Sequence, residues 1–138
     1  MEGGCALQAG MAVRRYAGRR ALVVETDQET RRLAKEVLES LGFNVEDVDN
    51  GIDAVSIARE SKPALIVMDL QLRDVGGLEL LQWLRANRAL RRVPVIAICA
   101  SQGDLPAMRH ARVSAVVRKP VSLPAITQAI ETAMAPSG

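Results

Sequence analysis

Asp69, Glu25 and Lys119 are the residues of this sequence whose types and positions could do chemistry together. Each stands directly after a short, largely apolar run of the kind that forms a buried strand, such as Ala-Leu-Ile-Val-Met before Asp69. If these strands are parallel, their carboxyl ends share one edge of a sheet, which is where such folds bind ligands. A carboxylate can attack a phosphoryl group when a cation and a lysine neutralise the approaching negative charges. The three residues therefore predict a phosphoryl site assisted by a cation, and oxygen ligands favour Mg²⁺.

The segments that must position these residues alternate between short apolar runs and amphipathic stretches. This alternation is typical of an α/β fold in which helices cover both faces of a parallel sheet. Right-handed crossovers and two-sided burial leave few windings, so we predict a flavodoxin-like, doubly wound five-stranded sheet in the order 2-1-3-4-5. The strands are predicted at about 21–25, 43–48, 64–69, 93–99 and 114–118, and the helices at about 28–41, 51–60, 77–87, 103–111 and 123–134.

The composition predicts a single domain. The chain has 138 residues, 49% of them hydrophobic, enough for one core but not for two ordinary domains. Aromatic residues make up only 2%, so stacking platforms are scarce and direct binding of nucleic acid is not expected. Of 18 basic and 16 acidic residues, four arginines and one glutamate lie in residues 1–20, which leaves 14 basic against 15 acidic residues. We therefore predict a flexible basic leader over 1–20 and a nearly neutral domain over 21–138, with no output domain.

The two cysteines and the distribution of apolar residues indicate the compartment. Cys5 lies in the leader and Cys99 inside a predicted strand, so no disulfide framework is expected and the thiols suit a reducing cytosol. No stretch approaches the roughly 20 apolar residues that span a bilayer, and the leader has no continuous apolar core of a secretory signal. We expect a cytoplasmic protein with no membrane contact.

The sequence resembles the receiver domains of two-component response regulators from about residue 20 to residue 134. The motifs that carry the resemblance are Leu-Ile-Val-Met-Asp-Leu-Gln-Leu around Asp69, Gly-Leu-Glu-Leu-Leu from Gly77, Val-Pro-Val-Ile-Ala from Val93, and Lys119-Pro120. Within this family the chain is most similar to the single-domain, DivK-like type, through the segment 56–63 and the residues that flank Asp69 and Pro120.

The resemblance implies a role for each site residue. Asp69 would be the phosphoacceptor and Lys119 the partner of the phosphoryl group. The Mg²⁺ ligands would be Glu25, Asp69 and the backbone carbonyl of Gln71. A cis peptide is implied between Lys119 and Pro120. The protein would be a signalling module rather than an enzyme, and it would receive its phosphoryl group from a histidine kinase or a phosphotransfer protein.

Thr26 is the first departure from the family pattern, because the family places a second acid directly after the first. A hydroxyl is a weaker, neutral cation partner than a carboxylate. Thr26-Asp27-Gln28-Glu29 fits a capping box, with Thr26 as the N-cap and Glu29 reaching back to it. Asp27 could take the place of the missing acid, although the first turn of a helix also favours an acid there because of the helix dipole.

Cys99 and Val116 are further departures, and with Thr26 they indicate a degenerate phosphorylation site. Cys99 stands where the family uses Ser or Thr to bond a phosphoryl oxygen, and a thiol is a weak donor that suits a small apolar plug. Val116 replaces the family's switch aromatic, so the usual coupling of a hydroxyl to an inward-turning ring cannot operate in that form.

Three functions remain open. The chain could be a phosphorylatable single-domain regulator that signals by binding proteins, or a pseudo-receiver interaction module that is not phosphorylated. A flavodoxin-like electron carrier is disfavoured, because acids follow the first strand where a flavin phosphate would sit. For either receiver we expect a monomer or weak homodimer. Its output surface is expected on the fourth helix, fifth strand and fifth helix, about residues 104–134, made basic in part by Arg109, Arg112 and Arg118.

Overall fold

The computed structural model describes residues 15–100 and 112–136. Within these ranges the predicted elements are found with small shifts at their ends. The order is β1 (Arg20–Val24), α2 (Gln28–Ser40), β2 (Asn44–Val48), α3 (Gly51–Ser61), β3 (Leu65–Asp69), α4 (Gly77–Ala86), β4 (Val95–Cys99), β5 (Ala115–Arg118) and α6 (Leu123–Met134). The helix predicted over 103–111 lies outside the described residues. In the described part of the chain, none of the helices has the length and apolarity that a membrane span requires.

The five strands form one parallel sheet in the order β2-β1-β3-β4-β5, as predicted. Because they are parallel, their carboxyl ends meet at one edge. Val24 is in register with Met68, Asp69 with Ile98, and Cys99 with Arg118. Glu25 and Lys119, one residue beyond β1 and β5, are therefore carried to the same edge as Asp69.

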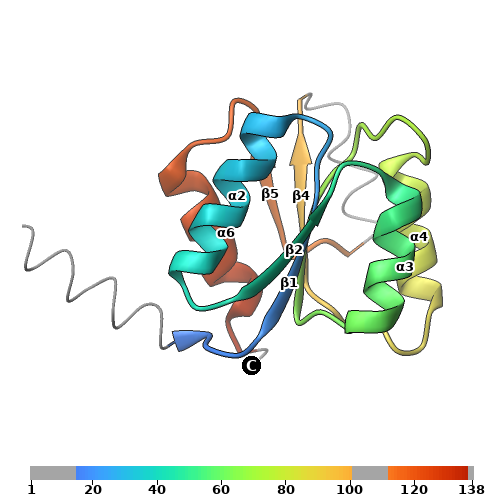
Figure 1. Cartoon of the computed structure of the whole chain (residues 1–138), viewed down its shortest axis with the longest axis horizontal. Coiled ribbons are helices and arrows are strands. Elements are labelled where there is room, and N and C mark those ends of the chain that lie inside the picture. Colours follow the sequence, from blue (N-terminus) through green and yellow to red (C-terminus); the bar gives the residue numbers. More distant parts are fainter. Residues whose placement is uncertain (1–14, 101–111, 137–138) are drawn as a thin grey trace, which may run out of the picture.

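Helices cover both faces of the sheet, with α2 and α6 on one side and α3 and α4 on the other (Figure 1). Successive side chains of a strand point to opposite faces. In β1, Ala21 and Val23 accordingly pack with α2 and α6, whereas Leu22 and Val24 pack with α3 and α4. All five residues of β3 and of β4 are buried, as expected for central strands covered on both faces.

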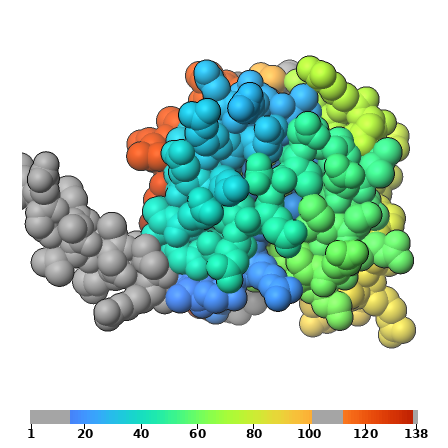
Figure 2. Space-filling model, in the orientation of Figure 1, coloured from blue at the N-terminus to red at the C-terminus, as the bar shows by residue number. Residues whose placement is uncertain are grey.

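The edge strand β2 lies between α2 and α3 on the face shown in the space-filling view (Figure 2). Asp47 on this strand forms ion pairs of 3.2 Å with both Arg31 and Lys35 of α2. Charged residues on an edge strand oppose pairing with a second sheet. The pairs also fix Arg31, which has a part in the site described below.

The described fold reaches into the segment that the sequence assigned to the leader. Arg20 begins β1, and Tyr16 is only 5% exposed, with its ring stacked on Phe43 at a centroid distance of 5.0 Å. Arg15 lies over the Tyr16 ring at 5.2 Å. Tyr16 belongs to the core cluster on the α2 and α6 face, so the packed domain includes residues before position 20.

Candidate phosphoacceptor site

Asp69 ends β3 with a side chain that is only 2% exposed. Its Oδ1 atom accepts a hydrogen bond of 2.9 Å from the backbone N–H of Gln71. The strand is buried because Leu-Ile-Val-Met is apolar throughout, and the polar residue at its end therefore emerges at the sheet edge rather than within a face. The result is a single carboxylate held in a defined orientation.

Lys119 lies beside Asp69 because it directly follows β5 and so stands at the same edge of the sheet. Its backbone N–H donates to the Cys99 carbonyl at 2.9 Å, and the Lys119-Pro120 peptide is cis. Lys119 Nζ lies 2.7 Å from Asp69 Oδ2, and 3.3 and 3.4 Å from the two carboxylate oxygens of Glu25. One ammonium group thus contacts both buried acids.

Glu25 follows β1 and has a fully buried side chain. Its Oε2 accepts a hydrogen bond from the backbone N–H of Asp27 at 3.0 Å, while Oε1 is buried and accepts no hydrogen bond from the part of the chain that the structure describes. Arg31 fixes the backbone at this point, because its Nη1 donates to the Glu25 carbonyl at 2.9 Å. Glu25 is therefore firmly placed and yet incompletely satisfied.

The charges of the three groups are coupled. Burial, together with the neighbouring Asp69 carboxylate, raises the pKa of Glu25 from 4.5 to about 7. Burial also acts to raise the pKa of Asp69, but hydrogen bonds from Glu25 and Lys119 lower it on balance. Burial acts to lower the pKa of Lys119, yet its contacts with Asp69 and Glu25 raise it on balance. Without a further cation, Asp69 is ionised first and Glu25 retains a proton up to near neutral pH.

A divalent cation fits this donor set. Two buried carboxylates face a single lysine. Oε1 of Glu25 lies 3.3 Å from Lys119 Nζ but accepts no hydrogen bond from the described residues, so it is an oxygen that a hard cation could use. Residues 15–100 and 112–136 contain no group of three or more His, Cys, Asp or Glu side chains able to hold a metal. A cation here would therefore rest on Glu25, Asp69 and backbone oxygens, for which the sequence suggested the carbonyl of Gln71.

The capping box predicted at the start of α2 is wrong, because it places the N-cap one residue too early. Asp27, not Thr26, is the N-cap, and its Oδ2 accepts from the backbone N–H of Thr30 at 2.9 Å and from Thr30 Oγ1 at 2.6 Å. The helix begins at Gln28, and a charged carboxylate at the preceding position is the stronger acceptor for its free N–H groups. Thr26 Oγ1 instead donates to the Asp49 carbonyl at 3.3 Å. Both candidates for the second acid position are thus engaged in contacts of their own.

Cys99 and Val116 occupy the two remaining positions that the sequence singled out. Cys99 ends β4, is completely buried, and belongs to the core cluster on the α3 and α4 face. Val116 on β5 is 37% exposed. Arg112 is exposed, but it lines a pocket at the other end of the sheet; Arg109 lies outside the described residues.

Asp74 and Gly77 support the loop after Asp69 and were not anticipated from the sequence. The Asp74 carboxylate accepts hydrogen bonds of 2.9 Å from the backbone N–H groups of Gly51 and Ile52, at the start of α3. A Cβ atom on Gly77 would lie 2.4 Å from Leu70 Cα. In the sequence Gly77 indicates only the start of a helix, so its close approach to Leu70 could not be inferred. The Asp74 contact joins residues that are 23 positions apart in the chain.

Comparison with known proteins agrees with this architecture. The family model of the response regulator receiver domain matches residues 21–131. The polar-differentiation response regulator DivK of Brucella anthropi is 35% identical over 113 residues, which cover 80% of this chain and 92% of that protein. The homologue of Brucella ovis is 34% identical over the same coverage.

Solved structures show the same fold. The receiver domain of sensor histidine kinase PA1611 from Pseudomonas aeruginosa PAO1, described with magnesium coordinated in its active site cleft, is 30% identical. The match has a TM-score of 0.76 and covers 85% of this chain and 98% of that one. The bacteriophytochrome response regulator RtBRR is also 30% identical, with a TM-score of 0.75, over 87% of this chain and 80% of that one.

Proposed function

The chain belongs to the response regulator receiver domain family, and we propose that it is a single-domain regulator that accepts a phosphoryl group on Asp69. As a receiver it is a two-component signalling protein and not an enzyme. The donor would be a histidine kinase or a phosphotransfer protein, and the signal would pass on by protein binding in the cytoplasm. The observation that carries the proposal is the contact of Lys119 Nζ with Asp69 Oδ2 at 2.7 Å, beside buried Glu25.

The roles follow from charge and position. Asp69 is the nucleophile, because its lowered pKa keeps it ionised at neutral pH. An oxygen of Asp69 attacks phosphorus, the new P–O bond forms, and the bond from phosphorus to the donor's histidine nitrogen breaks. Lys119, already within reach of Asp69, would move its contact to an oxygen of the transferred group.

Glu25 and the Gln71 carbonyl would hold Mg²⁺ together with Asp69. Receiver domains typically bind this ion in the active site. When bound, it would supply positive charge that offsets the negative charge of the acids and of the phosphoryl group. This chain's own contribution is to keep Glu25 in place through the Arg31 contact with its carbonyl and the Asp27 N–H contact with its Oε2.

A hollow next to the site suits the approach of the donor. It has a volume of about 730 Å³ and lies between the start of α2 and the segment after β5. Asp27, Thr30 and Leu33 line one side, and Lys119, Pro120 and Val121 the other. We propose that the phosphodonor docks here, and that the output surface is the face of β5 and α6, where Val116 is exposed. We propose a monomer or weak homodimer.

A pseudo-receiver is the second candidate, and one specific observation favours it. Neither possible replacement for the second acid is free, because Thr26 is bonded to Asp49 and Asp27 caps α2. Such a protein would bind its partners without phosphorylation. The two candidates are separated by incubating the full chain with acetyl phosphate and Mg²⁺ and then measuring its intact mass. A gain of one phosphoryl group in wild type but not in Asp69→Asn supports the regulator. No gain in either protein supports the pseudo-receiver.

A further inference from the structure

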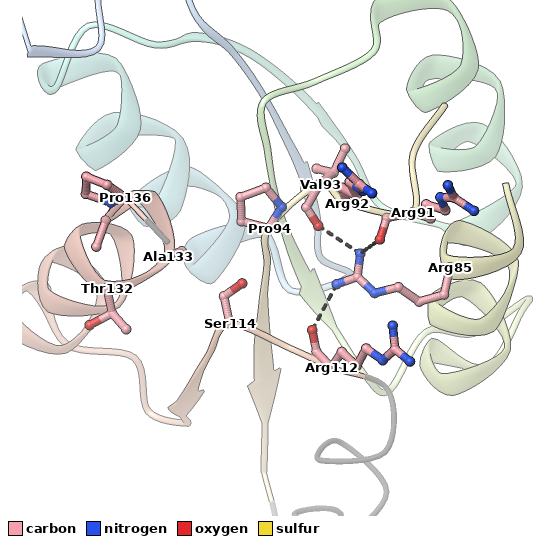
Figure 3. Close-up of a pocket in the computed structure, with 11 residues that line it drawn as sticks. Arg85, Arg91, Arg92, Val93, Pro94, Arg112, Ser114, Thr132, Ala133 and Pro136 are labelled. Carbon is pink, nitrogen blue, oxygen red and sulfur yellow. Dashed lines mark hydrogen bonds between the residues drawn. The ribbon is translucent and has the colours of Figure 1, made fainter. Parts of the chain in front are cut away.

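A pocket of about 480 Å³ lies at the opposite end of the sheet from Asp69 (Figure 3). Val93 and Pro94 precede β4, and Ser114 precedes β5, so the pocket opens at the amino ends of these strands. The end of α6, including Thr132, forms the other wall. We call it the arginine pocket, because Arg85, Arg91, Arg92 and Arg112 all line it and none of the described residues that line it is acidic.

Arg85 organises one wall of the arginine pocket. Its guanidinium donates to the carbonyls of Arg91, Val93 and Arg112 at 3.0, 2.9 and 3.0 Å, respectively (Figure 3). These three carbonyl oxygens would otherwise present negative ends toward the pocket. Arg85 therefore both joins the loop before β4 to the residues before β5 and masks acceptors that would repel an anion.

The charge of the pocket is one-sided. Among the residues that the structure describes, Arg91, Arg92 and Arg112 form no ion pair with a carboxylate. The C-terminal ends of α4 and α6 contribute roughly half a negative charge each, which leaves the three guanidinium groups of Arg91, Arg92 and Arg112 in excess. Burial and the nearby charge of Arg112 lower the pKa of Arg85, as expected where positive charges crowd together.

The backbone conformation of Arg112 and two hydroxyl-bearing residues are further features of the arginine pocket. Arg112 has a left-handed backbone conformation, with φ of 59°, which a residue with a side chain adopts at some cost. The conformation places its carbonyl on Arg85. Ser114 and Thr132 bring two hydroxyl groups to the lining, and neither forms a side-chain hydrogen bond within the described residues. Two hydroxyl-bearing residues and four arginines thus line one pocket.

We propose that the arginine pocket binds a small molecule that carries a phosphate or diphosphate group. Arginine is suited to phosphate because its planar fork donates two parallel hydrogen bonds, and hydroxyl donors complete the shell of phosphate oxygens. The volume lies within the roughly 300–1,000 Å³ of small-molecule sites. This ligand would bind without Mg²⁺ and at the end of the sheet remote from Asp69, so its test is independent of phosphorylation.

Inorganic pyrophosphate is a suitable probe. We expect calorimetric titration of the full chain, in EDTA at low ionic strength, to show saturable binding. Amide NMR shifts should concentrate at residues 91–93 and 112–114. The double variant Arg91→Ala, Arg92→Ala should bind at least about tenfold more weakly, the loss expected for one charge-assisted hydrogen bond. Asp69→Asn should bind as wild type does.

The matched control is the double variant Arg59→Ala, Arg88→Ala, which removes two exposed arginines that do not line the pocket. It lowers the net charge equally and should leave the affinity within about twofold, because neither side chain lines the pocket. No binding by wild type, an equal loss in both double variants, or shifts centred on Asp69 and Lys119 would each overturn the proposal.

Discussion

Lys119 Nζ and Asp69 Oδ2 are 2.7 Å apart, although 50 residues separate them in the chain. The contact joins the ends of β5 and β3, which are separated in the sheet by β4. Glu25 shares the same ammonium group. The charge state of this site is thus set by one cationic side chain working against two buried carboxylates.

Replacing Lys119 by Gln should raise the pKa of Asp69. The lysine and its hydrogen bond stabilise the ionised carboxylate, so without them protonation of Asp69 sets in at a higher pH. The side-chain carboxyl ¹³C shift of Asp69, followed by NMR over a pH titration, measures this directly. Lys35→Gln removes a lysine that forms an ion pair with Asp47 and should leave the pKa of Asp69 unchanged. An unchanged Asp69 curve in Lys119→Gln would show that Lys119 does not set the ionisation of Asp69.

Thr26→Asp should strengthen Mg²⁺ binding. A third acid near Asp69 and Glu25 adds an attraction on the order of 1–4 kcal/mol at about 4 Å, so the affinity should rise about tenfold or more. The cap of α2 is not disturbed, because Asp27 provides it. Titration calorimetry on wild type, Thr26→Asp and the control Thr26→Ser gives the comparison. Equal affinity in all three would place the cation away from residue 26.

Asp74→Ala should destabilise the fold by removing two acceptors at the start of α3. The N–H groups of Gly51 and Ile52 lower the pKa of Asp74 from its ordinary value of 3.8. Its contribution to stability is therefore complete above about pH 4 and is lost as the pH falls through the lowered pKa of the folded state.

Urea midpoints between pH 7 and pH 2 test this linkage. The wild type should be more stable than Asp74→Ala at pH 7, and the difference should shrink in acid. Asp74→Asn retains an amide oxygen and no titrating group, so it should lose less stability than Asp74→Ala at pH 7. A difference that is constant down to pH 2 would contradict the role of the ionised carboxylate.

Gly77→Ala should destabilise the protein by more than about 2 kcal/mol, which is in the upper part of the usual cost of overpacking or above it. The new Cβ would meet the Leu70 backbone at 2.4 to 2.8 Å, and a backbone cannot yield as a flexible side chain does. Gly76→Ala is the control: its nearest neighbours are 3.8 Å away, and its cost should stay below about 1 kcal/mol. Chemical unfolding of both variants decides the point, and equal stabilities would refute the steric argument.

The fold and the meeting of Asp69, Glu25 and Lys119 could be predicted because both depend on local patterns. Apolar runs give the strands, and parallel pairing brings their carboxyl ends to one edge. The cap of α2 was placed one residue early. Thr26 and Asp27 are both good N-caps, and only the observed start at Gln28 selects Asp27.

Contacts between distant segments could not be predicted in the same way. The Asp74 contact at the start of α3 and the close approach of Gly77 to Leu70 depend on how the loop after β3 folds back. Tyr16 lies in a stretch rich in Gly, Ala and Arg without periodicity, and its burial becomes visible only through Phe43. The arginine pocket joins the end of α4 to residue 112. In the sequence its arginines are scattered, so nothing there indicates that they line one pocket.

Phosphorylation of Asp69 is the central claim, and intact-mass measurement tests it most directly. The full chain is incubated with acetyl phosphate and Mg²⁺, alongside Asp69→Asn and the exposed-acid control Asp53→Asn. We predict the mass gain of one phosphoryl group in wild type and in Asp53→Asn, its loss in EDTA, and none in Asp69→Asn. A wild-type chain that gains no mass with Mg²⁺ present, or a gain that persists in Asp69→Asn, would contradict the assignment of Asp69 as the phosphoacceptor.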